Sequence, residues 1–206
     1  MNFSVPLILF AALSLSPSIV SAQSAAELLE AARAQSKEIE ELKGVMDGPD
    51  RNLRLAAFDA MVAGENSLYR DIAVEAGLAS SDSLLRARAL NHAIGSVNSL
   101  VITLSVDTSA SKTIQELTTK YLAENRQLLT LTLSKKTSSA SGVNGALSND
   151  YRGGAGGTFE VLGLQMMFSA PYNYITGELT LKDDAVLTGP VSTSEGHRFI
   201  GTARLR

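Results

Sequence analysis

Residues 82–106 read DSLLRARALNHAIGSVNSLVITLSV, and the spacing of apolar side chains changes within this stretch. Up to Val97 the apolar residues recur every three or four positions, as they do on one face of an α-helix. From Ser99 to Val106 a large aliphatic residue stands at every second position, which is the period of a β-strand. We therefore expect helices before Ser99 and strands after it, although the preceding helix could also run on through this segment.

The sequence before Ser99 predicts four amphipathic helices. Ser24, followed three residues later by Glu27, is a capping-box pattern at the start of the first helix. Asp50 is placed to cap the second helix, residues 65–76 form the third, and Ser81 or Asp82 is placed to cap the fourth. Glycines mark the expected helix ends: Gly44 and Gly48 for the first, Gly64 for the second and Gly77 for the third.

Two of these helices share a pattern with a period of 32 residues. The first set is Asp50, Leu53, Arg54 and Ala57, and the second is Asp82, Leu85, Arg86 and Ala89. The pattern Asp-x-x-Leu-Arg-x-x-Ala, over residues 50–94, resembles HEAT-type helical repeats. That resemblance implies a scaffold or a protein-binding surface, with Arg54 and Arg86 as candidate partner-binding residues. Two merely similar amphipathic helices remain the alternative.

The sequence after Ser99 predicts a series of short strands with one short helix near 113–125. An apolar-x-Gly-x-apolar motif recurs at 143–147, 175–179 and 187–191, and mid-strand glycines are typical of bent or strongly coiled sheets. We expect residues 159–168 to form one long apolar strand and Lys182–Ala185 to form a hairpin turn. The fold class predicted is α+β: about four helices, including two HEAT-like units, followed by an antiparallel β-sandwich or small barrel of about seven strands.

The N-terminus carries the features of an export signal. The apolar run Val5–Leu15 is shorter than the roughly 20 residues needed to span a bilayer, and small residues at 21 and 22 suit cleavage after Ala22. We expect a signal peptide at 1–22, a helical domain at 23–98 and a β-domain at 99–206, in an exported protein that is periplasmic or secreted. After cleavage no transmembrane segment is expected; a retained N-terminal anchor is the alternative.

Composition narrows the classes of function. The 206 residues carry a net charge of -3, and the basic surface that nucleic acids require is therefore not expected. The absence of cysteine excludes disulfides, thiolate metal sites and cysteine nucleophiles. Residues 23–125 contain 10 Lys and Arg against 15 Asp and Glu, whereas residues 126–206 contain 8 against 6, which supports a division into two parts. No cofactor and no metal site are expected.

Few residues are candidates for chemistry. His197, with Glu195 two residues before it, is a candidate catalytic pair, and a surface turn is the alternative interpretation. Tyr172 and Tyr174 are candidate ligand-binding aromatic residues, together with Arg152 in a glycine-rich loop; packing within the sheet would explain the tyrosines equally. His92 is expected to pack within its helix.

These observations favour a non-enzymatic binding or scaffolding module of the cell envelope, since residues that could carry catalysis are sparse and dispersed. The partner would be an envelope protein, a glycan or an apolar ligand. Two alternatives stay open: a hydrolase whose site assembles from distant residues, and a carrier of lipid or another apolar ligand inside a barrel.

Overall fold

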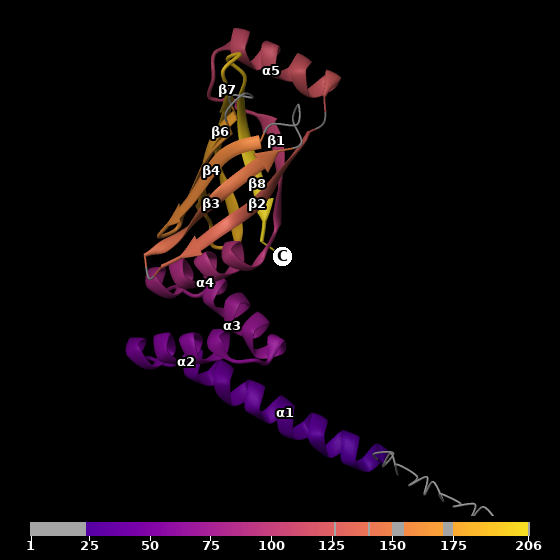
Figure 1. Ribbon diagram of the computed structural model, residues 1–206, viewed down its shortest axis with the longest axis vertical. Helices are drawn as coiled ribbons and strands as arrows, with labels where there is room; N and C mark the ends of the chain where they lie inside the picture. Colours follow the sequence, from indigo (N-terminus) through magenta and orange to yellow (C-terminus); the bar gives the residue numbers. More distant parts are fainter. Residues whose placement is uncertain (1–23, 126, 140, 150–154, 171–174, 206) are drawn as a thin grey trace, which may run out of the picture. The chain divides into compact units, whose positions relative to one another are not determined.

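The computed structural model describes residues 24–125, 127–139, 141–149, 155–170 and 175–205 (Figure 1). The expected signal peptide lies outside these residues. The chain divides into two compact units, one ending at Glu38 and the other beginning at Ile39. Each is described by itself below; helix α1 (Ala25–Met46) crosses the boundary. Among the helices that the structure describes, none is both long and apolar enough to cross a membrane.

The second unit contains a row of helices and a closed β-barrel. The remaining helices are α2 (Arg51–Ala63), α3 (Ser67–Ala79), α4 (Ser83–Ser96) and α5 (Lys112–Glu124). The strands are β1 (Ser99–Val106), β2 (Leu128–Ser138), β3 (Gly142–Asn149), β4 (Ala155–Leu162), β5 (Gln165–Ala170), β6 (Ile175–Leu181), β7 (Val186–Thr193) and β8 (Arg198–Arg204). The prediction of an α+β chain with an antiparallel sheet is confirmed, as is the strand that begins at Ser99.

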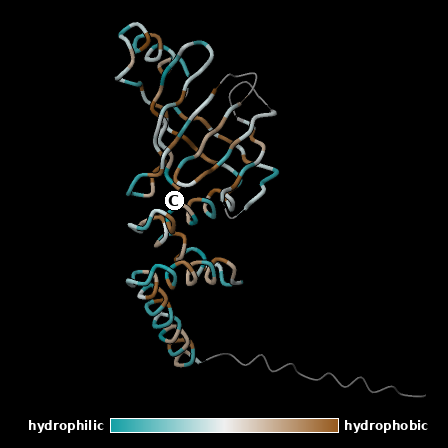
Figure 2. Tube along the Cα trace, turned by 90° about the vertical axis from the view of Figure 1, so that its left-hand side faces the viewer, coloured by the Kyte–Doolittle hydropathy of each residue, from teal (hydrophilic) through white to brown (hydrophobic). Residues whose placement is uncertain are grey.

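Each strand pairs with the next in antiparallel fashion, and β8 returns to β1 to close the barrel. In that closing pair Leu104 lies opposite Gly201. Buried and exposed residues alternate along the strands, for example in β1 and β5, so every second side chain points inward. Figure 2 shows apolar and more polar stretches of the trace side by side in the barrel. The buried inward side chains are Leu100, Ile102, Leu104, Leu129, Leu131, Leu133, Val143, Leu147, Phe159, Val161, Met166, Phe168, Ala170, Ile175, Leu179, Leu181, Leu187, Val191, Phe199 and Ala203. These side chains form one packed apolar core.

The glycine motif marks places where large side chains fill the barrel. Gly145, Gly177 and Gly201 stand at inward positions. A Cβ added at Gly177 would lie 2.3 Å from the Phe168 ring, and one at Gly145 would lie 2.8 Å from the Phe159 ring. Glycine therefore provides the space that these two aromatic rings occupy.

The prediction of one long strand over residues 159–168 is wrong. Leu162 pairs with Gln165, so only Gly163 and Leu164 connect β4 to β5. Gly163 has φ +59°, a left-handed conformation that a two-residue hairpin turn requires. The expected turn at Lys182–Ala185 is confirmed, because Lys182 N–H donates to the Val186 carbonyl at 2.8 Å.

The helix caps follow the sequence closely. Ser24 and Glu27 form the expected capping box, with Ser24 N–H donating to Glu27 Oε2 at 2.9 Å. The Asp50 and Asp82 side chains accept backbone N–H groups at the starts of α2 and α4. Asn66 does the same for α3, which consequently begins at Ser67. The period of 32 is thus made of two steps of 16, with a capping side chain at each step.

Each cap is followed four residues later by an arginine that binds carbonyl oxygens elsewhere in the chain. Arg54 donates to the Gly48 carbonyl at 2.7 Å, and Arg70 donates to the Gly64 carbonyl at 2.8 Å, each at the end of the preceding helix. Arg86 instead reaches the barrel: it donates to the Leu181 carbonyl at 3.4 Å and pairs with Asp183 at 2.9 Å. The last arginine of the row thereby joins α4 to the turn between β6 and β7.

Gly77 does not end the third helix, contrary to the expectation. It lies buried inside α3, which continues to Ala79. A Cβ at Gly77 would lie 2.7 Å from Ala89 Cβ and 3.2 Å from the Phe58 ring. The glycine is required for close approach of α3 to its neighbours rather than for helix termination.

Two helices lie at opposite ends of the barrel (Figure 1). Helix α4 packs against β2, β3 and β4, and Lys136 at the end of β2 donates to the Val97 carbonyl at 2.7 Å. Helix α5 packs against β1 and β8, where Thr118 Oγ1 accepts the Arg198 N–H at 3.1 Å.

Candidate functional site

The candidate pair His197 and Glu195 lies at the barrel end next to α5. His197 is buried, and its ring lies 4.5 Å from the Tyr121 ring, centroid to centroid. Its Nδ1 lies 2.8 Å from Thr193 Oγ1 and 4.0 Å from Glu195 Oε2. The His197 backbone N–H also donates to Thr193 Oγ1 at 3.3 Å.

This geometry holds a turn together. Gly196, at φ +90°, donates its N–H to the Thr193 carbonyl, so the Thr193–His197 contact closes a tight β7–β8 hairpin. Nucleophilic catalysis needs a hydroxyl at one imidazole nitrogen and an orienting carboxylate at the other. In His197 the Thr193 hydroxyl and the Glu195 carboxylate both lie on the Nδ1 side of the ring.

Asp107, a residue that the sequence reasoning did not single out, is buried nearby. Its carboxylate accepts the Ser109 hydroxyl at 2.6 Å and the Ser109 N–H at 2.9 Å, and Arg198 Nε lies 3.8 Å away. The hydrogen bonds from Ser109 lower the pKa of Asp107, with a smaller contribution from the Arg198 charge. The spacing Asp-x-Ser is the local signal of such a turn, and it positions the segment between β1 and α5.

A small cleft of about 350 Å³ lies between α2, α4 and the end of β2. It is lined by Phe58, Asp59, Val62, Arg88, Asn91, His92, Ser138 and Ser139. Arg88 pairs with Asp59 across it. Asn91 Oδ1 and His92 Nε2 are fully buried, and neither has a hydrogen-bond partner among the described residues. Since these two atoms are not exposed to the cleft, they do not offer a ligand a contact.

The burial of His92 makes stability depend on pH. Burial is the main cause that lowers the His92 pKa; Arg70 lowers it further, and Asp71 opposes this. The unfolded chain therefore binds the proton more tightly than the folded chain, and stability falls as the pH drops below the ordinary value of 6.5. We expect the melting temperature to fall between pH 7 and pH 5, and to fall less in a His92→Leu variant. An identical decrease in both proteins would contradict this assignment.

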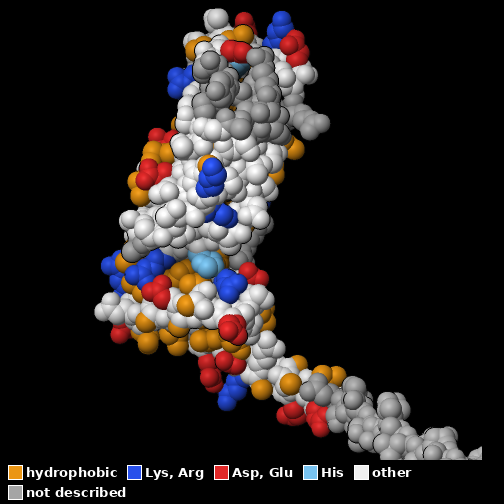
Figure 3. Space-filling view, viewed as in Figure 1, with side chains coloured by type: hydrophobic (Ala, Val, Ile, Leu, Met, Phe, Trp, Pro, Cys, Tyr) orange, Lys and Arg blue, Asp and Glu red, His pale blue; other side chains and the backbone are white. Residues whose placement is uncertain are grey.

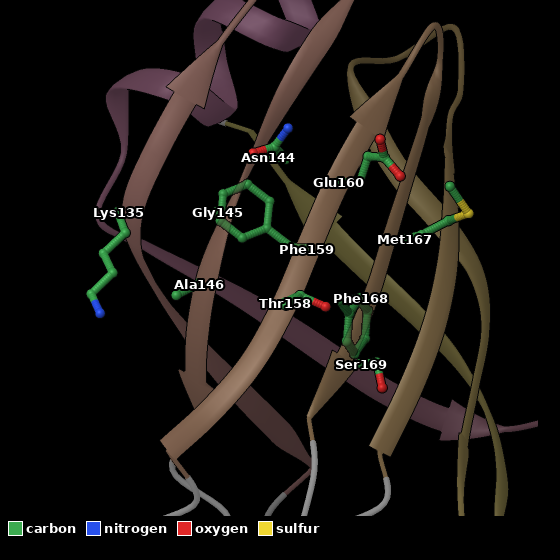
Figure 4. A pocket seen from close by; sticks show the side chains of 10 residues that line it. All are labelled: Lys135, Asn144, Gly145, Ala146, Thr158, Phe159, Glu160, Met167, Phe168 and Ser169. Atoms are coloured by element: carbon green, nitrogen blue, oxygen red, sulfur yellow. The ribbon is translucent and has the colours of Figure 1, made fainter.

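A groove with both polar and apolar lining residues lies on the outer face of the barrel (Figure 4). Its volume is about 610 Å³. It is lined by Lys135, Asn144, Gly145, Ala146, Thr158, Phe159, Glu160, Met167, Phe168 and Ser169. These residues come from four consecutive strands, β2 to β5, so the groove crosses the strands. We define this surface as the β3–β5 groove.

Strand register places the groove side chains in two rows. One row runs Asn144, Glu160 and Met167, which lie opposite one another on β3, β4 and β5. The other row contains only small side chains, Ala146, Thr158 and Ser169. The inward-facing Phe159 and Phe168 lie between the rows, and both are buried. The row of small side chains leaves space for a bound segment. The other row supplies the amide of Asn144, the negative charge of Glu160 and the thioether of Met167.

A β-bulge forms one wall of the groove. The pairing of β2 with β3 shifts register between Ser134 and Thr137. Within the bulge Lys135 has φ +48°, a conformation that is uncommon for any residue other than glycine. Bulges redirect side chains, and strained backbone persists where the surrounding structure holds it. Lys135 and Glu160 are exposed charges that line the groove, and neither has an ion-pair partner among the residues that the structure describes.

Arg54 and Arg86, the sequence-predicted partner-binding residues, do not line the groove. Tyr172, Tyr174 and Arg152 lie outside the described residues. Arg54 and Arg86 keep only 17% and 11% of their side-chain surface, because both are engaged in the contacts within the chain given above. Among the described residues no group of acidic, histidine or cysteine side chains could hold a metal ion.

No protein-family model, curated protein or solved structure matches this chain.

Proposed function

We propose that this protein is a non-enzymatic binding module of the cell envelope that holds a polypeptide segment of a partner protein in the β3–β5 groove. The observation that carries the proposal is the groove itself: an open surface lined by exposed groups of both charges above a packed barrel. A rigid platform that positions a few polar groups is well suited to binding, since little of it must be ordered when a partner arrives. The expected export signal is what assigns the module to the envelope.

A polypeptide matches the groove better than a glycan or a lipid. Lys135 offers a contact for carboxylates and Glu160 one for amines, while Asn144, Thr158 and Ser169 offer hydrogen bonds to a peptide backbone. Ala146 and Met167 provide apolar contact area. Sugar recognition commonly uses an aromatic ring face, whereas the two phenylalanines that line the groove are buried. A lipid tail would need an apolar cavity, whereas the inward-facing side chains of the described strand residues pack against one another in a buried core.

A peptide selection tests the proposal. Peptides selected from a random display library on the immobilised protein should bind it in solution. Ala146→Trp fills the row of small side chains, and we expect it to weaken binding at least about tenfold, equivalent to about 1.4 kcal/mol. Lys135→Glu should weaken the binding of peptides that carry acidic residues. Both positions face outward, so neither change alters the core.

The matched control is Thr103→Trp, which adds the same side chain at an exposed position on β1, away from β3 to β5. This variant should bind the selected peptides as the unmodified protein does. If Ala146→Trp and Thr103→Trp bind equally well, the groove is not the binding site. If no peptide is enriched while a glycan array yields a binder, the partner class is wrong.

A further inference from the structure

The acidic side chains on the outer face of the barrel extend beyond the β3–β5 groove. Met167 on β5 lies opposite Glu160 on β4 and opposite Glu178 on β6, so the two carboxylates flank the thioether in one row across the strands. Glu178 is exposed, and no Lys, Arg or His in the described part of the chain forms an ion pair with it. The face of the barrel in Figure 3 carries few charged side chains, and acidic ones lie beside hydrophobic ones at its left edge. A ligand that crosses these strands therefore meets two negative groups.

Charged groups in this row alternate with uncharged ones from strand to strand. Lys135 stands in the β2 bulge, and Asn144 on β3, Glu160 on β4, Met167 on β5 and Glu178 on β6 follow it. Figure 4 shows Asn144, Glu160 and Met167 on neighbouring strands. Adjacent strands lie about 4.8 Å apart, so the three charges, one positive and two negative, follow at intervals of about 9.6 Å. A complementary ligand presents one negative and then two positive groups at the same interval.

A row of small side chains runs parallel to this charged row. Ser134 lies opposite Ala146, and Ser169 lies opposite Thr176, so the small side chains of the groove continue onto β2 and β6. The two rows are two residues apart along each strand, which is about 6.7 Å. The backbone of a bound segment can therefore lie over the small side chains, from where its own side chains reach the charged row.

The interval of about 9.6 Å indicates the backbone conformation of the ligand. A polyproline II helix has three residues per turn and rises about 3.1 Å per residue, so every third side chain returns to the same face after about 9.3 Å. In an extended strand, side chains on one face are about 6.7 Å apart. An α-helix returns to the same face after seven residues, about 10.5 Å, and overshoots the charges by about 2 Å between β2 and β6. Of these three conformations, polyproline II matches the row best.

The polar groups of the groove also suit this conformation. A polyproline II backbone forms no internal hydrogen bonds, so its carbonyl groups are free to accept hydrogen bonds from a protein. Thr158 and Ser169 present exposed hydroxyl groups in the row of small side chains. These hydroxyl groups can donate to the carbonyl groups of a segment that lies over them.

We propose that the β3–β5 groove, together with Glu178, binds a polyproline II segment that crosses the strands from β2 to β6. The segment carries an acidic side chain at Lys135 and basic side chains three and six residues away, at Glu160 and Glu178. Arginine suits both basic positions, since its guanidinium group forms two parallel hydrogen bonds with a carboxylate. This inference rests on the proposed function and adds the conformation and the charge sequence of the bound segment.

Titration of the isotope-labelled protein with short peptides tests the spacing. The peptides EPPRPPR and RPPRPPE present the required charges at the required interval in the two chain directions. One of them should give saturable shifts of the Thr158 and Ser169 backbone amides. It should bind at least about threefold more tightly than the peptide of the same direction and composition with one arginine moved off the shared face, EPPRPRP or PRPRPPE. Equal affinity of the altered-spacing peptide would overturn the proposal.

Neutralising single carboxylates tests which arginine meets which glutamate. Glu178→Gln should weaken the tighter peptide about threefold, but should not affect an analogue whose terminal arginine is replaced by glutamine. Glu160→Gln should weaken both peptides. The control is Glu116→Gln, which removes an exposed carboxylate from α5 and should bind both peptides as the unmodified protein does. An equal loss for both peptides in Glu178→Gln would contradict the assigned pairing.

The peptides selected from the display library separate this inference from the proposed function. If neither EPPRPPR nor RPPRPPE binds, while the selected peptides bind and Ala146→Trp weakens them, the inference is wrong and the proposed function stands. If no peptide of either kind binds the groove, both are wrong.

Discussion

Replacing Asp82 with alanine is expected to lower the free energy of unfolding by about 3 kcal/mol. The Asp82 carboxylate accepts the N–H groups of Leu84 and Leu85 at the start of α4 and also pairs with Arg51 and Arg54 at 3.0 and 2.9 Å. Loss of a helix cap costs about 1 kcal/mol. Leaving the mostly buried Arg54 without its carboxylate costs roughly 2 kcal/mol more. Urea unfolding followed by circular dichroism measures the difference.

The same residue gives a pH dependence with a defined sign. Burial alone would raise the Asp82 pKa, but the hydrogen bonds from Arg54, Leu84, Arg51 and Leu85 outweigh it and lower the pKa to about 2 from 3.8. Because the folded-state value is the lower one, the ionised carboxylate stabilises the fold above pH 3.8, and this contribution is lost as the pH falls toward 2.

Asp82→Asn is the matched control for both measurements. Asparagine caps helices about as well as aspartate, so this variant should lose less stability than Asp82→Ala. It should also lack the pH dependence below 3.8 that Asp82 provides. Equal losses in the two variants would show that the arginine contacts, rather than the cap, carry the whole effect. No loss in either variant would contradict the role assigned to Asp82.

Replacing Gly189 with alanine is expected to destabilise the barrel by about 3 kcal/mol, near the upper end of the usual range for overpacking. A Cβ at this position would lie 2.0 Å from the Glu178 carbonyl oxygen on β6. Since the obstructing atom belongs to the backbone, no side-chain rotation relieves the clash, and β6 and β7 must move apart.

Gly44→Ala is the opposing control. Gly44 lies in α1, and an added Cβ would meet nothing within 4 Å. Alanine favours the helix there, so this variant should gain about 0.5–1 kcal/mol. Denaturant midpoints of the two variants should therefore move in opposite directions. A neutral Gly189→Ala would show that β6 and β7 do not approach each other as closely as described.

Local patterns in the sequence predicted much of the fold because they depend on neighbouring residues. Asp50 and Asp82 mark helix starts through bonds to N–H groups two or three residues away, and the alternation after Ser99 fixes which side chains face inward. Closure of the sheet could not be predicted. It depends on β1 meeting β8, about a hundred residues later, and alternation reads the same in a sandwich and in a barrel.

The candidate groove was not predictable for the same reason. Its rows join Ala146, Thr158 and Ser169 from three strands, and none of these residue types is unusual in a sheet. The β-bulge at Lys135 occurs in a stretch of sequence without glycine. No residue type there indicates that the backbone adopts a positive φ. His197 is the opposite case, in which the sequence suggests a site and the structure shows a contact within a turn. A histidine beside a glutamate is a reasonable candidate for catalysis, and only the Thr193 contact reveals its part in a turn.

Chemical-shift mapping of a selected peptide on the isotope-labelled protein tests most directly that the outer face of the barrel is the binding surface. The backbone amides of Ala146, Thr158 and Ser169 are expected to shift most, with smaller changes near Lys135. Shifts concentrated instead around Tyr121 and His197, at the α5 end of the barrel, with β3 to β5 unaffected, would contradict the proposed function.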